Sequence, residues 1–428
     1  MDDRLLYATI LGMHAPWDVE RVELREAEQA VHVWVREAAG TSFGCPECMA
    51  PSPTYDHVER VWRHLDTCQF QTLLHAAVPR VRCAIHGVRT IAVPWAERHA
   101  HFTLLFERLA LAWLREATPT AVARRLGLTW EEANGIVERA VRRGLLRRAS
   151  VAGRRLGIDE HSDLKHHQYV TMVVDLEAQT VLHVADDRKA SSLDAYFSGL
   201  TCAERLGIEA IAIDMWEPYR QSVRRWVPDA DAKIVFDRFH VMGHVLEALD
   251  HVRRTEQRAL RQQGDRRLTG TKFLWLKTEI GRTDFTAAQR RACGALKAST
   301  LKSARAWAMK EAIRRLWAFR SIPRARHFFV RWYAWAIRSR LAPMRTLART
   351  LATLATLATL ATLATHLENI LTYLTHRITN AVTEGLNAKI QWIKYSSRGF
   401  RDRERFKTAI YFHCGGLDLE PRYESLEA

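Results

Sequence analysis

The sequence lacks the long apolar runs that cross a membrane. Its 428 residues contain no stretch of about 18 uncharged apolar residues, and the N-terminal segment MDDRLLYATILG lacks the basic and apolar parts of a secretory signal. The longest charge-free run, residues 350–365, has threonine at every third position and is too polar to span a bilayer. These absences favour a cytosolic protein with no membrane partner.

Cysteine is scarce and irregularly placed. The seven cysteines are odd in number and mostly scattered, which argues against the disulfide framework of a small secreted domain. They are Cys45, Cys48, Cys68, Cys83, Cys202, Cys293 and Cys414. Only the first cluster has a spacing that suggests a purpose.

Acidic residues are too few to balance the basic ones. The chain has 48 Asp and Glu against 64 Lys and Arg, a net charge of +16, which favours a polyanionic partner. Basic proteins also bind membranes and acidic proteins, so charge alone makes nucleic acid only the leading partner. With 47% hydrophobic residues, the chain is long enough for two or three packed units.

Two short motifs near the N-terminus predict a zinc site. Cys45-Pro-Glu-Cys48 and Cys83-Ala-Ile-His86 supply four ligands in two pairs with the same two-residue gap, which suits tetrahedral zinc. Four protein ligands leave no open position, so this zinc would be structural. A strand at 69–78 indicates a zinc-ribbon-like module with a long hairpin, within residues 1–100.

The ligand assignment has alternatives. The 34 residues between the two pairs exceed the usual ribbon spacing, and other side chains compete as ligands, namely Cys68, His57, His64 and His75. The plainer interpretation is a set of ordinary reduced cysteines with histidines nearby by chance.

Residues 118–144 have the pattern of a helix-turn-helix, within a domain at 101–150. Thr118 and Pro119 begin the first helix, Thr129 and Glu132 form a capping box for the second, and Gly144 is expected to end it. In this interpretation the second helix enters the DNA major groove. Four arginines would contact phosphates, namely Arg124, Arg125, Arg142 and Arg143. A generic helical hairpin with a solvated basic face is the alternative.

From residue 155 the pattern changes to strands. Three strands with short links are predicted at 155–161, 169–176 and 180–187. An amphipathic segment at 191–207, a strand at 209–215, a helix from Pro218 and a strand at 232–239 follow. This order is that of the ribonuclease H-like fold, a mixed sheet, so the fold class is α+β and multidomain.

Three carboxylates of this region form an ordered set. Asp159 lies in the first strand and Asp214 at the end of the fourth, which is its neighbour in this fold. Glu384 lies on a polar helical stripe with Asn380, Asn387, Gln391 and Lys394. Such a set could bind two Mg²⁺ (or Mn²⁺) ions about 4 Å apart for phosphoryl transfer. Each carboxylate taken alone would be an ordinary capping or solvated residue.

Asp237 is a rival for the second carboxylate because it also lies at a strand end. We expect it instead to act with His240, three residues later, to orient a metal-bound water or to grip a phosphate. A structural hydrogen-bonded pair is an equal alternative.

With these residues, the chain resembles the IS-L-three family of bacterial insertion-sequence transposases over nearly its whole length. The matching stretches include CPEC, VPRVRCAIHG, GIDEHSDLKHHQYVT, IAIDMWEPY, PDADAKIVFDRFHV, TNAVTEGLNAKIQWIK and RGFRDRERF. The resemblance implies zinc at Cys45, Cys48, Cys83 and His86, a helix-turn-helix near 118–144, and catalytic carboxylates at Asp159, Asp214 and Glu384.

More than a hundred mostly helical residues separate the last strand from Glu384. We therefore expect a catalytic core at 151–241, a helical insertion at 242–376, and the final core helix with the C-terminal tail at 377–428. The insertion is rich in Arg and Trp. Its tryptophans, namely Trp275, Trp307, Trp317, Trp332 and Trp335, are expected mostly in its core, with gripping of flipped bases or phosphates as the alternative.

Five Leu-Ala-Thr repeats from Leu351 to Thr365 depart from the family pattern. A period of three drifts around a helix of 3.6 residues per turn, so the leucines cannot stay on one face. The repeats lie upstream of Glu384 and put its placement, and hence activity, in question.

The sequence therefore predicts a DNA transposase that binds the terminal inverted repeats of an insertion sequence and catalyses strand cleavage and transfer into target DNA. We expect at least a dimer, because two ends must be held together, and a cytoplasmic, nucleoid-associated location. One alternative is an inactivated transposase that only binds specific DNA. Another is a structure-selective nuclease with the same metal site and no strand transfer.

Overall fold

The protein forms two compact units in the computed structural model, which describes residues 2–164, 168–277, 286–352, 365–400 and 402–422. Unit 1 combines Met1–Arg148 with Ser396–His413 and Leu417–Ala428, and unit 2 combines Ala149–Tyr395 with Cys414–Gly416. The segment 377–428, assigned to the core from the sequence, is thus divided between the units. The Leu-Ala-Thr repeats, apart from their two ends, lie outside the described residues.

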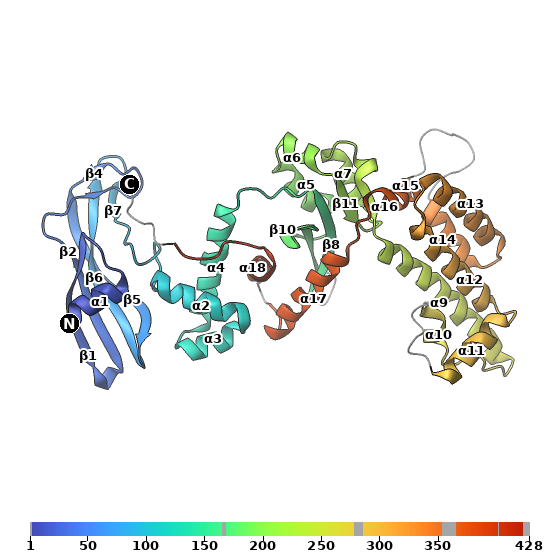
Figure 1. The fold of residues 1–428 in the computed structure, drawn as a ribbon, viewed down its shortest axis with the longest axis horizontal. Helices are drawn as coiled ribbons and strands as arrows, with labels where there is room; N and C mark the ends of the chain where they lie inside the picture. Colours follow the sequence, from blue (N-terminus) through green and yellow to red (C-terminus); the bar gives the residue numbers. More distant parts are fainter. Residues whose placement is uncertain (1, 165–167, 278–285, 353–364, 401, 423–428) are drawn as a thin grey trace. The chain divides into compact units, whose positions relative to one another are not determined.

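Unit 1 begins with a five-stranded sheet (Figure 1). Its elements are α1 (Asp3–Leu11), β1 (Trp17–Arg25), η1 (Glu26–Glu28), β2 (Ala30–Glu37), β3 (Phe43–Gly44), β4 (Pro51–Ser52), β5 (Thr54–Thr67), β6 (Phe70–Cys83) and β7 (Gly87–Thr90). The strand order is β1-β2-β6-β5, with β7 also beside β6 and with β3 and β4 as a separate hairpin. The long hairpin expected from the sequence is formed by β5 and β6.

One face of this sheet forms a core because its strands alternate buried and more exposed residues. In β6, Leu74, Ala76 and Val78 are buried at every second position, as a half-buried strand requires. They pack in one cluster with Trp62 of β5 and with residues of α1.

Three helices follow the sheet: α2 (Leu104–Glu116), α3 (Pro119–Leu126) and α4 (Trp130–Arg147). Their caps are as predicted: the Thr118 side chain accepts a hydrogen bond from the Ala121 N–H, and Thr129 and Glu132 form a capping box. Gly144 does not end α4, which continues to Arg147. A Cβ at Gly144 would lie 2.8 Å from Cβ of Leu417, so the glycine allows a close approach instead.

The C-terminal part of unit 1 completes this helical cluster. The helix α18 (Arg403–Cys414) supplies Phe412 and the following segment supplies Leu419, and both join the core formed by α2, α3 and α4. The two segments are nearly 300 residues from α4 in sequence, so sequence patterns around α4 could not indicate them.

Unit 2 contains a second five-stranded sheet, in the order β10-β9-β8-β11-β12. Its elements are β8 (Arg155–Leu164), β9 (Gln168–Asp175), β10 (Thr180–Asp186), α5 (Ala190–Ser198), α6 (Cys202–Gly207), β11 (Ala210–Ile213), α7 (Glu217–Trp226), α8 (Ala230–Lys233) and β12 (Ile234–Phe236). The first three strands are antiparallel, and β11 runs parallel to both β8 and β12. The predicted order of strands and helices is confirmed.

Two details of this sheet differ from or extend the prediction. The single helix expected at 191–207 is two helices, because Thr201 and Glu204 form a capping box that begins α6. The strand β11, between β8 and β12, is buried along its whole length, which is usual for a parallel strand covered on both faces.

The helical insertion follows β12. Its helices are α9 (Arg238–Gln262), α10 (Lys272–Leu276), α11 (Ala287–Ala298), α12 (Lys302–Ile313), η3 (Arg314–Ala318), α13 (Ile322–Arg338), α14 (Ala342–Ala352), α15 (Thr365–Leu371) and α16 (Tyr373–His376). Four of its five tryptophans are core residues as expected, whereas Trp335 is 42% exposed. Within the described part of the chain, no helix is both long and apolar enough to cross a membrane.

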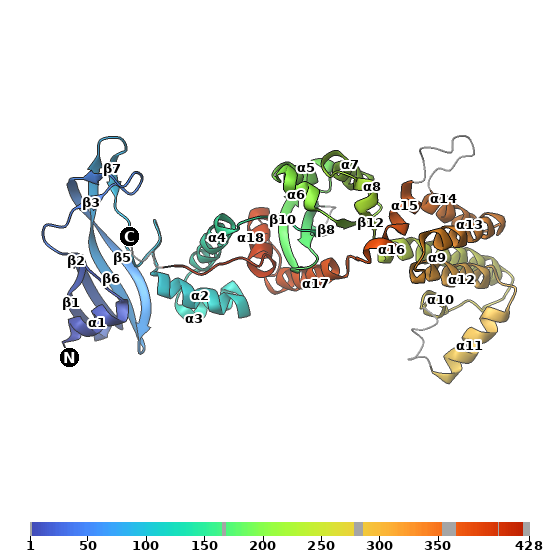
Figure 2. The ribbon, with the colours of Figure 1, turned by 45° about the horizontal axis from the view of Figure 1, so that its top comes forward.

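The chain then returns to the sheet of unit 2 through α17 (Ala381–Ser396). Both views show α17 beside β8 (Figures 1 and 2), and the Asn380 side-chain amide donates to the Ile158 carbonyl at 3.4 Å. The approach is close because β8 has a glycine there. A Cβ at Gly157 would lie 2.5 Å from Oγ1 of Thr383.

Candidate functional sites

Two aspartates meet at the carboxyl ends of neighbouring strands in unit 2. Asp159 lies in β8 and Asp214 directly follows β11. These strands are parallel, with Gly157 opposite Ala212, so the residues two positions further along both strands are neighbours. Asp159 is buried and Asp214 is half-buried.

His240 joins the two aspartates. Ligand atoms of Asp159, Asp214 and His240 all lie within 4.8 Å of one another, and Nε2 of His240 lies 3.0 Å from Oδ1 of Asp214. His240 is placed there by Asp237, which caps the N-terminus of α9 and accepts hydrogen bonds from the N–H groups of Phe239 and His240. Asp237 is therefore a capping residue beside the carboxylate pair and not a member of it.

The cluster concentrates negative charge in a buried place. Burial, and secondly the charge of Asp214, raises the pKa of Asp159 to about 7. The hydrogen bond to Asp214 raises the pKa of His240 to about 9. Two carboxylates with oxygen atoms within 4.8 Å of each other fit a hard divalent cation such as Mg²⁺ or Mn²⁺.

The helix α17 supports this cluster through amides. Asn387 donates a hydrogen bond from Nδ2 to Oδ2 of Asp159 at 2.8 Å, and the Asn380 backbone N–H donates to Oδ1 of Asp237 at 3.1 Å. Glu384, on the same helix, is exposed and is not among the residues that the structure groups with Asp159 and Asp214. The carboxylate expected there thus lies one turn before the amide that contacts Asp159.

A cation and an aromatic ring lie directly beside the cluster. The Arg188 guanidinium lies 3.0 Å from Glu160 and stacks 4.1 Å from the ring centre of Trp216. The Trp216 indole N–H donates to the Arg188 carbonyl at 3.1 Å, which fixes the ring while leaving it 37% exposed. Positive charge and a rigid exposed ring therefore flank Asp214.

The four predicted zinc ligands come together in unit 1. Cys45 and Cys48 lie around the β3–β4 hairpin, and Cys83 and His86 lie at the turn from β6 to β7. Nδ1 of His86 is 3.6 Å from both Cys45 Sγ and Cys83 Sγ, and Cys48 Sγ is 3.7 Å from Cys83 Sγ. Tetrahedral zinc separates such atoms by about 3.5–3.8 Å.

The electrostatics of this cluster also fit zinc. The backbone N–H groups of His86 and Ile85 lower the pKa of Cys83 to about 6, which favours the thiolate that binds metal. The sequence and the geometry together support a structural zinc ion.

The competing ligands are engaged elsewhere or lie apart. His57 pairs with Glu37, His64 with Thr103 and His75 with His32. Cys68 is exposed at the tip of the β5–β6 hairpin. None of these four belongs to the metal-ligand groups found among the described residues.

Three of the four arginines predicted to contact DNA are exposed: Arg124, Arg125 and Arg142. Arg143 is buried, which makes it a structural residue and corrects the prediction. Its guanidinium pairs with Glu97 and donates to the Leu419 carbonyl at 2.7 Å. It joins α4 to the C-terminal segment.

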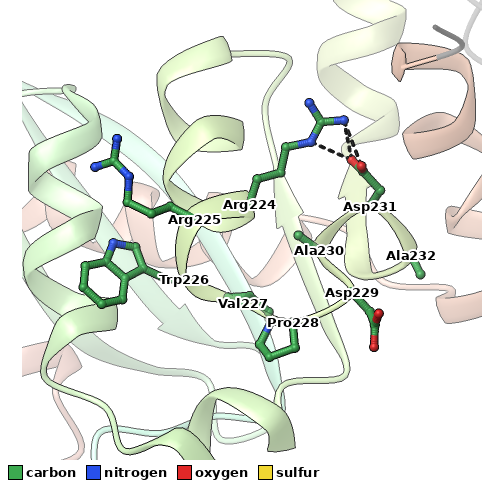
Figure 3. Close-up of a pocket in the computed structure, with 9 residues that line it drawn as sticks. All are labelled: Arg224, Arg225, Trp226, Val227, Pro228, Asp229, Ala230, Asp231 and Ala232. Atoms are coloured by element: carbon green, nitrogen blue, oxygen red, sulfur yellow. Dashed lines mark hydrogen bonds and ion pairs between the residues drawn. The ribbon is translucent and has the colours of Figure 1, made fainter. Parts of the chain in front are cut away.

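A surface hollow of about 620 Å³ lies between the end of α7 and α8 (Figure 3). Its lining residues are 224–232, and Arg224 forms two hydrogen bonds to Asp231 across it, at 2.8 and 2.9 Å. The hollow adjoins the amino end of β12, whereas the carboxylates lie at the carboxyl ends of the strands. It is therefore separate from the carboxylate site.

The sequence prediction underrated two members of the carboxylate site. His240 was expected beside the metals and lies within the ligand group, and Asn387 was seen only as part of a polar stripe. The stripe at helical spacing was the available signal for Asn387. Which residue of the stripe contacts Asp159 depends on how α17 is rotated about its axis against β8. That rotation could not be predicted from the sequence.

Three family models match the chain in order. One described as "zinc-finger of transposase IS204/IS1001/IS1096/IS1165" matches residues 41–86, and one described as "Helix-turn-helix domain of transposase family ISL3" matches residues 91–141. A third ISL3 model, described as "Transposase", matches residues 156–410, more than half of the chain.

Curated relatives agree with these matches. The chain is 28% identical over 430 residues to the transposase for insertion sequence element IS1557 of Mycobacterium tuberculosis, covering 92% of each chain. It is 26% identical to the transposase for insertion sequence element IS1001 of Bordetella parapertussis, over 95% of this chain and 97% of the relative.

Proposed function

The chain belongs to transposase family ISL3, and we propose that it cuts and joins DNA at the carboxylate site formed by Asp159, Asp214 and Glu384. As a DNA transposase it binds DNA through its helix-turn-helix domain. The observation that carries the catalytic proposal is the convergence of Asp159, Asp214 and His240 within 4.8 Å.

The fold of unit 2 supports a ribonuclease H-like core. Three antiparallel strands followed by two parallel ones, in the order β10-β9-β8-β11-β12, place the first and fourth strands side by side. That adjacency brings together carboxylates 55 residues apart in sequence. Fold alone would not define the reaction, so the proposal depends on the carboxylates.

Asp159 and Asp214 would hold Mg²⁺ or Mn²⁺, and Glu384 would supply a further carboxylate. Such ions activate the attacking oxygen and stabilise the leaving oxygen in phosphoryl transfer. Glu384 lies three residues before Asn387, on the neighbouring turn of α17, and its exposed side chain is free to turn toward the cluster.

The residues around the pair favour a phosphate. Without a metal ion, the hydrogen bond to Asp214 raises the pKa of His240 to about 9, so the imidazole is positively charged at neutral pH and can attract a phosphate oxygen. Arg188, which pairs with Glu160 and stacks on Trp216, adds a second cation near the site. In the proposed reaction, water hydrolyses the phosphodiester bond at each element end, and the freed 3′-hydroxyl then attacks a phosphate of target DNA and displaces the 3′-oxygen of the target strand.

The N-terminal modules would find the terminal inverted repeats. Exposed Arg124, Arg125 and Arg142 on α3 and α4 are placed to contact phosphates, while zinc would hold the β3–β4 hairpin against the end of β6. Because two ends must be held at once, we expect at least a dimer, acting on the nucleoid in the cytoplasm.

The test is a plasmid that carries the DNA flanking this gene on both sides, incubated with the purified full-length chain and Mg²⁺. We expect nicks or breaks at the element ends. Asp159→Asn should reduce their rate by at least about 10³-fold while leaving end binding intact, because the two-metal site loses a ligand.

Asp229→Asn is the matched control. It removes an exposed carboxylate from the hollow between α7 and α8, and asparagine tolerates the left-handed backbone there (φ 56°). Its cleavage rate should equal that of the wild type. Absence of cleavage by the wild type would refute the catalytic proposal. Failure to join pre-cut ends would instead indicate a nuclease.

A further inference from the structure

The positive charge of the chain is concentrated in the helical insertion. Residues 242–376 contain 25 of the 64 Lys and Arg but 8 of the 48 Asp and Glu. The rest of the chain is close to neutral. By net charge, the insertion is therefore a strong candidate for binding a polyanion, in addition to the helix-turn-helix.

Within the insertion, α13 presents basic residues on one exposed stripe. Arg324, Arg331 and Arg338 recur every seven residues, and His327 and Trp335 lie between them. At 100° per residue, all five fall within about 80° of the helix circumference. All five are exposed, whereas Ala325, Phe329, Trp332 and Ala336 on the other side are buried.

The charges of this stripe are not compensated by the protein. The helix α13 contains no acidic residue, and its buried side packs against α12, α14 and α15 (Figure 1). Among the described residues, Glu368 is the acidic group paired with α13, and its partner is Arg326, outside the stripe. An exposed row of guanidinium groups without acidic neighbours attracts a polyanion.

We propose that the α13 stripe binds the phosphate backbone of duplex DNA without reading its sequence. Arginine forms strong, often bidentate hydrogen bonds to phosphate oxygens. From Arg324 to Arg338 the helix extends about 21 Å, and duplex DNA carries about 12 phosphate charges over that length. This inference rests on the proposed function in one respect, because that function identifies the polyanion as DNA.

The stripe lacks the amide and carboxylate side chains that read adenine and cytosine. It has no Asn, Gln, Asp or Glu, which are common contacts to adenine and cytosine, and its arginines are spread along the helix instead of grouped at one end. A surface of this kind holds DNA of any sequence. The helix-turn-helix domain is separate from it in the chain.

The test measures binding and needs no cleavage. The full-length chain carrying Asp159→Asn is titrated with a fluorescent duplex of arbitrary sequence at several salt concentrations. Replacing Arg324, Arg331 and Arg338 together by Ala should weaken binding roughly tenfold or more. It should also reduce the slope of the logarithm of the binding constant against the logarithm of salt concentration by about three. The corresponding triple Lys variant should retain most of the affinity.

The matched control replaces Arg4, Arg36 and Arg225 by Ala. These side chains are 57%, 67% and 62% exposed, and each is already paired with an acid. The control removes the same net charge but should bind almost like its parent. Thermal unfolding of each variant checks that the fold is retained.

The proposal would be overturned if the triple Ala variant of the stripe and the triple Ala control bound DNA with equal affinity and equal salt dependence. A preference for single-stranded DNA that is lost in Trp335→Ala would also overturn it, because stacking on an exposed ring would then carry the binding. Neither result bears on cleavage at Asp159, so this inference and the catalytic proposal can fail separately.

Discussion

The two candidate metal centres of this chain differ in how they are assembled. The zinc cluster of unit 1 takes its ligands from two short motifs, each with a two-residue gap, and fills all four positions of a tetrahedron. The cluster of unit 2 takes Asp159, Asp214 and His240 from three elements separated by dozens of residues, and it leaves positions open.

The difference in chemistry follows from the difference in assembly. A closed set of soft ligands stabilises the fold around it and offers no place for substrate. In the second cluster, burial and the charge of Asp214 disfavour the ionised form of Asp159, so without a metal ion this carboxyl costs stability at neutral pH. Removing a ligand should therefore have opposite effects on stability in the two clusters.

The largest expected effect comes from breaking the zinc cluster. Cys48→Ser should lose the zinc ion and lower the melting temperature of unit 1 by at least about 10 °C, because the free energy of structural zinc binding contributes directly to folding. Zinc content by elemental analysis, together with thermal unfolding by circular dichroism, measures both outcomes.

Cys68→Ser is the control for this prediction. Cys68 is exposed at the tip of the β5–β6 hairpin and lies outside the cluster, so the variant should keep one zinc ion and its melting temperature. Full zinc content in Cys48→Ser, or loss of zinc in Cys68→Ser, would show that the ligands are assigned wrongly.

Removing a carboxylate from the cluster of unit 2 should instead raise the stability of the fold. A carboxyl with a pKa of about 7 in the folded protein and 3.8 in its reference state destabilises the fold progressively as the pH rises from about 4 to 7. Asp159→Asn removes that charge and leaves a side-chain carbonyl that can still accept from Asn387. At pH 8 without Mg²⁺, we expect a gain of about 1–3 kcal/mol in the free energy of unfolding.

The pH and metal dependence make this prediction specific. The gain should shrink as the pH falls below 7 and nearly vanish only near pH 4, where Asp159 is largely protonated in the reference state as well as in the folded protein. Added Mg²⁺ should stabilise the wild type more than the variant, because ligand binding favours the folded state. Asp229→Asn should show none of these differences. A lower melting temperature of Asp159→Asn in Mg²⁺-free buffer at pH 8 would contradict the account.

The same contrast explains what could be predicted from the sequence. The zinc ligands follow from local spacing, and the order of strands and helices follows from hydrophobic periodicity. The adjacency of Asp159 and Asp214 follows from the fold that this order predicts. Each of these depends on residues near one another or on a known topology.

Features that depend on distant packing were not predictable. Arg143 is basic and helical, and nothing in its neighbourhood indicates that Glu97 and the Leu419 carbonyl bury it. Gly144 has the residue type of a helix end, but the close approach of Leu417 explains the glycine. Both errors arise from a C-terminal segment that returns to α4.

The smallest effect concerns the support that α17 gives to the carboxylate site. Asn387→Ala should raise the Mg²⁺ concentration needed for half-maximal cleavage by about tenfold, because a lost hydrogen bond to a ligand leaves that ligand poorly oriented. The zinc content should not change. Cleavage rates measured over a range of Mg²⁺ concentrations give this shift directly.

Gln391→Ala is the matched control, since it removes an exposed amide one turn further along α17. If both variants show the wild-type dependence on Mg²⁺, Asn387 does not position Asp159. If Asn387→Ala loses activity at every Mg²⁺ concentration without a shift, the amide acts on the DNA and not on the carboxylate. A shift confined to Asn387→Ala would show that the carboxylate cluster depends on packing of the distant helix α17. The zinc cluster, in contrast, takes its ligands from two short motifs.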